Sequence, residues 1–167
     1  MDSDRISHVR CWVEIDDDTL AALFQSRSFG RGGALRLSFD TLRFEEEFFA
    51  LPVLRMWTHA TINIVRGSDA VAFETYGSGT LVLRRDGARL LVHRDRPFQG
   101  RPAVGTGALV ITTEQLVSAL LGAHRALARQ VFRVLPAHIR EDHPAWRAIQ
   151  DERGQLKQAW HRIRTKR

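Results

Sequence analysis

The chain has 167 residues, of which 44% are hydrophobic and 26% charged, and these values exclude a disordered chain. The single cysteine, Cys11, excludes an internal disulfide and fits a reducing compartment, and no run approaches the ~20 apolar residues of a membrane span. The acidic start of the sequence does not resemble a signal peptide, so we expect one soluble cytoplasmic domain with no membrane partner.

The first quarter of the chain carries strand patterns separated by an acidic break. Apolar alternation over residues 6–15 predicts a strand that ends at Asp16-Asp17-Asp18. We expect Asp17 or Asp18 to cap a short helix that follows. Residues 35–39 predict a second strand, and residues 42–48 predict either a third strand or a bent continuation of the second.

The middle of the chain predicts a helix followed by an antiparallel meander. Pro52 suits the first turn of a helix that continues to about Ile64. The segments 71–76, 80–85 and 88–93 have strand composition. Asp86-Gly87 between the last two is typical of a two-residue hairpin turn.

The last third of the chain predicts two long helices. After an expected loop over residues 94–107 and a short strand near residue 110, Thr112 and Gln115 resemble a capping box. The helix that they open ends before Pro136, and Pro144 begins a final helix with one apolar stripe. The expected fold class is α+β: an antiparallel sheet packed by helices, with residues 1–143 as the core domain and residues 144–167 as a basic helix packed on it.

No recognisable catalytic or metal-binding signature is present. The seven histidines lack metal-ligand spacing; His138 and His143 fit a polar loop that caps the last helix, and His124 fits the apolar face of the long helix. No nucleophile elbow or phosphate-binding loop appears. We therefore expect no catalysis, no metal and no cofactor. The alternative is an enzyme whose site is assembled from residues dispersed along the sequence.

Two acidic clusters suggest a docking surface for a basic protein partner, because clustered carboxylates steer an oppositely charged surface. Phe48 and Phe49 follow the second cluster and could anchor such an interface. The alternative is a helix cap for the first cluster and a solvated strand edge for the second. The six candidate partner-binding residues are Asp16, Asp17, Asp18, Glu45, Glu46 and Glu47.

The final helix offers an alternative function. Residues 144–167 hold seven basic and two acidic residues and account for most of the net charge of +6. These side chains could contact nucleic-acid phosphates while Trp146 and Trp160 stack on bases, although both tryptophans lie on the apolar stripe. The candidate nucleic-acid-binding residues are Arg147, Lys157, Arg162, Arg164, Lys166 and Arg167.

A polar stripe is expected on the helix after Pro52. Arg55, His59, Asn63 and Arg66 recur every three or four residues, which is typical of the solvated face of an amphipathic helix.

A family pattern runs through residues 45–136. It consists of the run FFALPVL at 48–54 leading to Trp57, FET at 73–75, a hairpin with RDG at 85–87, and a helix opened by TTEQL at 112–116. This stretch resembles small proteins of unknown function from high-GC bacteria, and proteins with this layout are similar to immunity proteins of polymorphic toxin systems. The resemblance implies a non-enzymatic protein that neutralises a cognate toxin by binding it in the cytoplasm, and it assigns no individual residue.

Overall fold

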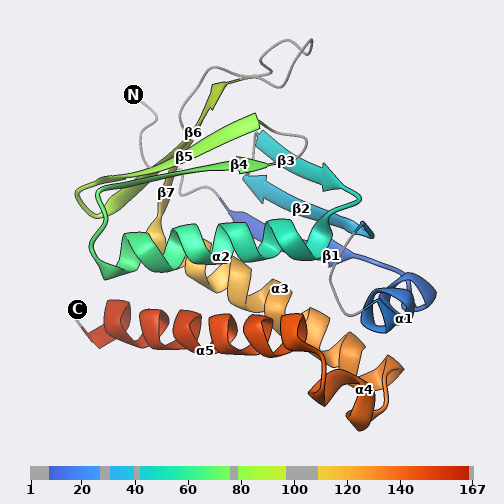
Figure 1. Cartoon of the computed structure of the whole chain (residues 1–167). Coiled ribbons are helices and arrows are strands. Elements are labelled where there is room, and N and C mark those ends of the chain that lie inside the picture. Colours follow the sequence, from blue (N-terminus) through green and yellow to red (C-terminus); the bar gives the residue numbers. More distant parts are fainter. Residues whose placement is uncertain (1–7, 27–30, 40–41, 76–78, 97–108, 166–167) are drawn as a thin grey trace.

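The computed structural model describes residues 8–26, 31–39, 42–75, 79–96 and 109–165 (Figure 1). Within these ranges the chain forms seven strands in two antiparallel sheets, together with five helices. The predicted α+β class is confirmed. The strands divide into two sheets, however, where the sequence pattern suggested one.

The first sheet contains β1 (Val9–Glu14), β2 (Ala34–Phe39) and β3 (Leu42–Glu47), in that order. Leu35, Leu37 and Phe39 alternate along β2 and are buried, as the period of two in the sequence predicts. Residues 42–47 pair antiparallel with β2, so they form a separate strand and not a continuation of it.

The second sheet is the predicted meander of β4 (Ala70–Thr75), β5 (Gly79–Asp86), β6 (Arg89–Arg96) and β7 (Leu109–Thr112). Asp86 pairs with Arg89, so the turn residues are Gly87 and Ala88, one position later than predicted. Gly87 supplies the positive φ of 59° that this turn requires at its first position. Residues 94–96 belong to β6, and residues 97–107 of the expected loop lie outside the described ranges.

The first helix, α1 (Asp17–Gln25), begins one to two residues earlier than predicted. Its N-cap is Asp16, not Asp17 or Asp18, because the Asp16 carboxylate accepts hydrogen bonds from the Thr19 amide at 2.8 Å and from the Thr19 hydroxyl at 2.7 Å.

Four further helices complete the fold: α2 (Ala50–Arg66), α3 (Thr113–Val134), α4 (Ala137–Glu141) and α5 (Pro144–Thr165). The predicted capping box at Thr112 and Gln115 is confirmed. The expected loop before Pro144 contains the short α4, and the Trp146 amide donates to His143 Nδ1 at 3.3 Å at the start of α5. A histidine of this loop therefore caps the last helix, as expected.

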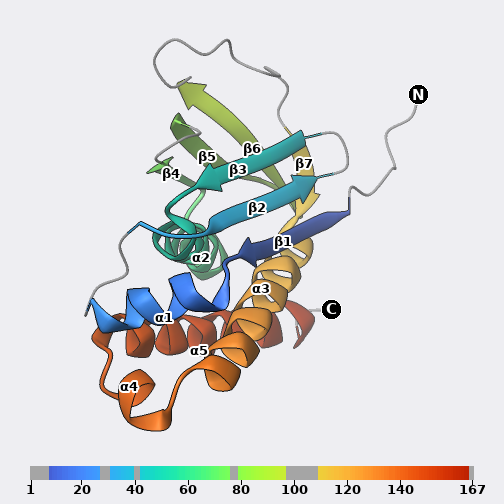
Figure 2. The same ribbon diagram turned by 90° about the vertical axis from the view of Figure 1, so that its right-hand side faces the viewer.

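The elements are stacked in three layers. Figures 1 and 2 show both sheets on one side of α2 and α3, with α5 beneath these two helices. The inner side of β1 packs on α3, while α2 contacts strands of both sheets and α5. The central helices are consequently covered on two sides, and this explains why α2 is buried on more than one face.

Trp57 of α2 joins the two sheets. Its ring centroid lies 6.3 Å from that of Phe39, 5.8 Å from that of Phe44 and 5.1 Å from that of Phe73. The first two rings belong to the first sheet and the third to β4 of the second sheet. The indole is 1% exposed, so one side chain fills the junction between the sheets and α2.

Replacing Trp57 with Ala should lower the free energy of unfolding by about 3–5 kcal/mol, since truncation of a buried aromatic leaves a cavity among its neighbours. Trp57→Phe, which keeps a ring at this position, should lower it by less. Urea unfolding followed by circular dichroism measures both. Equal losses in the two variants would contradict a filling role for the indole.

Candidate functional site

The first acidic cluster is largely engaged within the chain. Asp16 caps α1, and hydrogen bonds from Thr19 lower the pKa of its carboxyl group. Asp17 accepts from Gln130 at 2.9 Å and from Arg133 at 3.0 Å, and these contacts, Gln130 first, lower its pKa. Asp18 is exposed. Two of the three predicted partner-binding carboxylates are thus used within the chain: Asp16 caps α1, and Asp17 joins α1 to α3.

The second acidic cluster lies on the outer face of the first sheet. Arg36 stands between three carboxylates, at 2.8 Å from Glu14, 3.0 Å from Glu45 and 3.3 Å from Glu47. Glu46 of β3 lies opposite Leu35 of β2 in the sheet register, and the side chain of Glu46 is not among those that the structure describes. The sheet therefore brings Glu45 and Glu47 together with Glu14, a residue that the sequence patterns did not single out.

Trp12 completes this group. Its indole N–H donates to Glu14 at 3.0 Å; this bond, together with Arg36, lowers the pKa of Glu14, while the Glu14 carboxylate raises the pKa of Arg36. Trp12, Glu14, Arg36 and Glu45, with Leu37, line a hollow of about 340 Å³. We call Trp12, Glu14, Arg36, Glu45 and Glu47 the acidic sheet face. Arg10 pairs with Ser38 on the same side of the sheet, so the three carboxylates face two described guanidinium groups there, Arg10 and Arg36.

The two phenylalanines after this cluster have different roles. Phe49 is half-buried and packs on the core, whereas Phe48 is 53% exposed. Phe48 has a φ of 71°, a left-handed conformation that is strained for a bulky side chain. The Arg31 guanidinium lies 4.6 Å from its ring centroid, and Gly32 N–H donates to the Phe48 carbonyl. The chain thus holds one large apolar ring in solvent at the end of β3.

The basic residues of α5 are only partly free for a ligand. Lys157, Arg162 and Arg164 are exposed, whereas Arg147 donates to the Glu141 carbonyl at 2.6 Å. Lys166 and Arg167 lie outside the described ranges. The four described cations of this set, Arg147, Lys157, Arg162 and Arg164, are spread along α5.

The tryptophans of α5 pack onto the body of the protein. Trp146 is 5% exposed, and its ring lies 5.8 Å from that of Phe24. Trp160 is partly buried against the core, with the Arg164 guanidinium 5.7 Å from its ring. Trp146 is therefore not available to stack on a base.

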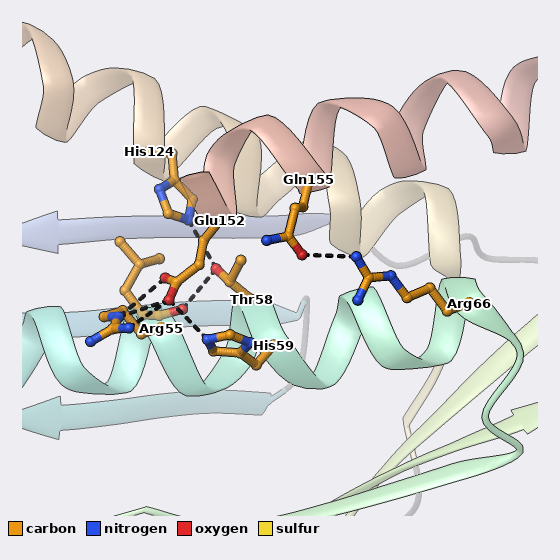
Figure 3. Close-up of polar contacts among 8 residues, drawn as sticks. Arg55, Thr58, His59, Arg66, His124, Glu152 and Gln155 are labelled. Carbon is orange, nitrogen blue, oxygen red and sulfur yellow. Dashed lines mark hydrogen bonds and ion pairs between the residues drawn. The ribbon is translucent and has the colours of Figure 1, made fainter. Parts of the chain in front are cut away.

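A polar network that the sequence analysis missed joins α2 to α5 (Figure 3). Glu152 is 3% exposed, and its carboxylate accepts from Arg55 Nη2 at 2.7 Å, Arg55 Nε at 2.9 Å and His59 Nε2 at 2.8 Å. A carboxylate paired with a guanidinium only accepts, so His59 Nε2 carries the proton. Arg66 donates to Gln155 at 2.9 Å.

The stripe of α2 that we expected to face solvent therefore lies beside α5. Three of its residues, Arg55, His59 and Arg66, form hydrogen bonds to residues of α5. The signal in the sequence was Glu152 itself, three residues after Ile149 on the apolar stripe of the last helix. A carboxylate on a buried helix face needs a positively charged or hydrogen-bond-donating partner on the element packed against it. Arg55 and, one turn later, His59 of α2 are these partners.

His124 occupies the core beside this network, as predicted. Its Nε2 lies 2.9 Å from the Thr58 hydroxyl, which donates its own proton to the Leu54 carbonyl at 2.8 Å, so His124 Nε2 is the donor. Nδ1 has no hydrogen-bond partner among the described residues. Burial, helped by the positive charge of Arg153, lowers the pKa of His124 to about 4.

Other reactive groups are not assembled into a site in the part of the chain that the structure describes. Burial raises the pKa of the Cys11 thiol, which disfavours a nucleophilic thiolate. No group of three or more His, Cys, Asp or Glu residues there has the geometry to hold a metal ion. Within the same ranges, none of the helices has the length and apolar character that a bilayer crossing requires.

Comparison of this chain with protein-family models, with curated proteins and with solved structures finds no match. The candidate surfaces are consequently assigned from their own geometry: the acidic sheet face with Phe48, the exposed cations of α5, and the network around Glu152.

Glu152→Gln should lower the free energy of unfolding by about 1–3 kcal/mol, because the neutral amide replaces a buried acceptor of charge-assisted hydrogen bonds. Asp151→Asn makes the same chemical change at the neighbouring exposed position and should have little effect. Thermal or urea unfolding of both variants measures the difference. Equal stabilities would show that the network does not hold α5 in place.

The unfolding free energy should fall as the pH drops from about 6.5 to about 4, since the unfolded chain protonates His124 at its ordinary pKa while the folded chain resists it. The decrease in unfolding free energy that His124 causes should reach about 3 kcal/mol near pH 4. Above pH 6.5 His124 is neutral in both states, and its full stabilising contribution is present. His124→Gln, which keeps a donor but does not titrate, should flatten the profile. His143, whose pKa burial also lowers, remains in both proteins, so only the difference between their urea-unfolding profiles reports His124.

Proposed function

We propose that this chain is a protein-binding module that engages a basic partner through the acidic sheet face and the adjacent Phe48. The observation that carries the proposal is the convergence of three carboxylates on Arg36, next to an exposed ring in a strained conformation. Strained residues persist where the surrounding structure imposes them, and they are frequent at binding sites.

The charge of this face orients a charged partner as it approaches. The whole chain has a net charge of +6, so its average field repels a basic protein. A local excess of carboxylates on one sheet then selects the orientation in which such a partner approaches. A basic partner is favoured at this face and disfavoured over α5, where exposed Lys157, Arg162 and Arg164 lie.

The aromatic residues supply the apolar part of the contact. Trp12 lines the hollow beside Arg36, and Phe48 stands exposed where β3 ends. Aromatic anchors surrounded by polar groups are typical of the energetic centre of protein interfaces. A basic side chain of the partner that enters the hollow would meet Glu14 and Glu45 together.

The proposal depends on Glu14, Glu45 and Glu47 and does not require Asp16 or Asp17, because those two carboxylates are already bound within the chain. Asp18 is exposed at the start of α1 and could extend the surface. The role of Glu46 in binding stays a prediction.

The biological form that we propose is neutralisation of a toxin by direct binding, as the resemblance of residues 45–136 to immunity proteins suggests. The sequence pattern supports the neutralisation of a toxin, whereas the acidic sheet face supports only the binding of a basic protein. A toxin that acts on nucleic acid would present a basic surface and would therefore suit this face.

The nucleic-acid alternative predicts a different use of the molecule. It retains the exposed cations of α5 but loses Trp146 as a stacking platform, because that ring is buried. It predicts binding that weakens steeply with salt and that disappears when the basic residues of 144–167 are neutralised.

Recovery of the tagged protein from its native cells, with and without nuclease, should yield one stoichiometric basic protein that survives nuclease. Glu45→Lys with Glu47→Lys should then raise the Kd for that protein about tenfold or more, mainly through slower association. Surface plasmon resonance at two salt concentrations measures this effect.

Glu74→Lys with Asp86→Lys is the matched control, since it makes the same charge change at exposed positions of the second sheet. An equal loss of affinity in both double variants would point to net charge and not to the acidic sheet face. Recovery that depends on nucleic acid would instead support the alternative.

A further inference from the structure

The strand β4 forms one edge of the second sheet. Among the described residues it pairs only with β5, and Figure 2 shows it at the outer side of that sheet. Short or highly charged edge strands resist pairing with further strands. The edge strand β7 has only four residues and β3 ends in three glutamates, whereas β4 has six residues and contains neither lysine nor proline. The edge of β4 is therefore the less protected one.

Half of the backbone groups of β4 point away from β5. The Arg85 N–H donates to the Asp69 carbonyl at 2.7 Å, so these two residues are a hydrogen-bonded position of the ladder. Hydrogen-bonded and non-hydrogen-bonded positions alternate along an antiparallel pair. The N–H and C=O groups of Ala70, Ala72 and Glu74 consequently face the free side of the strand.

The outer face of this edge carries one charge of each sign. Ala70, Ala72 and Glu74 are exposed, and so is Arg84 of β5, which lies opposite Ala70. Within the part of the chain that the structure describes, the side chains of Glu74 and Arg84 have no ion pair or hydrogen bond. Both charges are thus available to another molecule.

The inner face of the edge is incompletely covered. Val71 and Phe73 are only half-buried, and with Met56 of α2 they border a hollow of about 410 Å³. Side chains that point inward from an added strand would lie at this hollow. An aromatic residue opposite a β-branched residue stabilises the pairing of two strands, so Val71 and Phe73 suit such a contact.

We propose that two copies of this chain pair through β4 in antiparallel orientation, with Ala72 opposite Ala72 of the second copy. Ala70 then lies opposite Glu74 of the second copy, so the residues with free backbone groups meet one another. Arg84 lies two strands away from that glutamate, about 10 Å at the usual strand spacing. Only the methyl group of Ala70 stands between them, so the guanidinium and the carboxylate can meet. Two-fold symmetry forms this ion pair twice.

The charges of the edge identify the occupant as a second copy, because they complement themselves under two-fold rotation. Sliding the strands by two residues in either direction keeps the backbone bonds but separates Glu74 from Arg84 of the other copy. The same register places Phe73 opposite Val71 of the second copy on the inner side. Each copy keeps its acidic sheet face, which belongs to the first sheet, so neither assignment rests on the other.

Sedimentation velocity of the full chain, from low micromolar to submillimolar concentration, should show a reversible monomer–dimer equilibrium. Ala72→Pro removes an N–H that faces away from β5, so the fold should persist while the Kd of the dimer rises about tenfold or more. Ala72→Val keeps that N–H and should dimerise like the unchanged chain. A monomer at every concentration, or equal dimerisation of the two variants, would overturn the proposal.

The ion pairs have a separate test that leaves the backbone unchanged. Glu74→Arg and Arg84→Glu each place like charges next to each other across the two-fold axis, so each should raise the Kd of the dimer about tenfold. A mixture of the two variants should form a heterodimer, since every cation then meets an anion, and a chain with both substitutions should dimerise again. Native mass spectrometry distinguishes these species. A mixture that associates no better than either variant alone would contradict the pairing centred on Ala72.

Discussion

The packing of Trp57 against both sheets is the constraint on which the other features depend. Phe39 and Phe44 reach the indole from the first sheet and Phe73 reaches it from the second. Neither sheet covers α2 alone, since each presents one apolar face of limited width. With α2 fixed at this junction, its remaining faces meet α3 and α5. Because Phe39 and Phe44 turn toward α2, the alternate residues of β2 and β3 face outward, and the acidic sheet face lies on that side.

The docking of α5 adds a polar requirement to an otherwise apolar contact. Apolar residues such as Ile149 and Leu156 bury one stripe of the helix, and this stripe alone tolerates rotation or sliding. Glu152 removes that freedom, because its buried carboxylate is satisfied only when Arg55 and His59 lie opposite it. Buried ion pairs often add little to stability, but an unpaired buried charge is costly. We therefore regard the network as a device that selects one register of α5 on α2.

The acidic sheet face has the opposite sign to the net charge of +6 of the whole chain. The acidic sheet face concentrates carboxylates around Arg36 and places Phe48 beside them, which suits a basic protein.

The sequence by itself determined the α+β class, most strands, the capping box at Thr112 and the core position of His124, because periodicity, turn residues and caps are local properties. It did not determine that the strands form two sheets or that Arg36 gathers three glutamates, since these depend on contacts between distant segments. The acidic runs were visible, but adjacent residues on a strand point to opposite faces, so only pairing showed that Glu45 joins Glu14. The tertiary structure likewise decided the network of Glu152, whose partners lie more than ninety residues away along the chain.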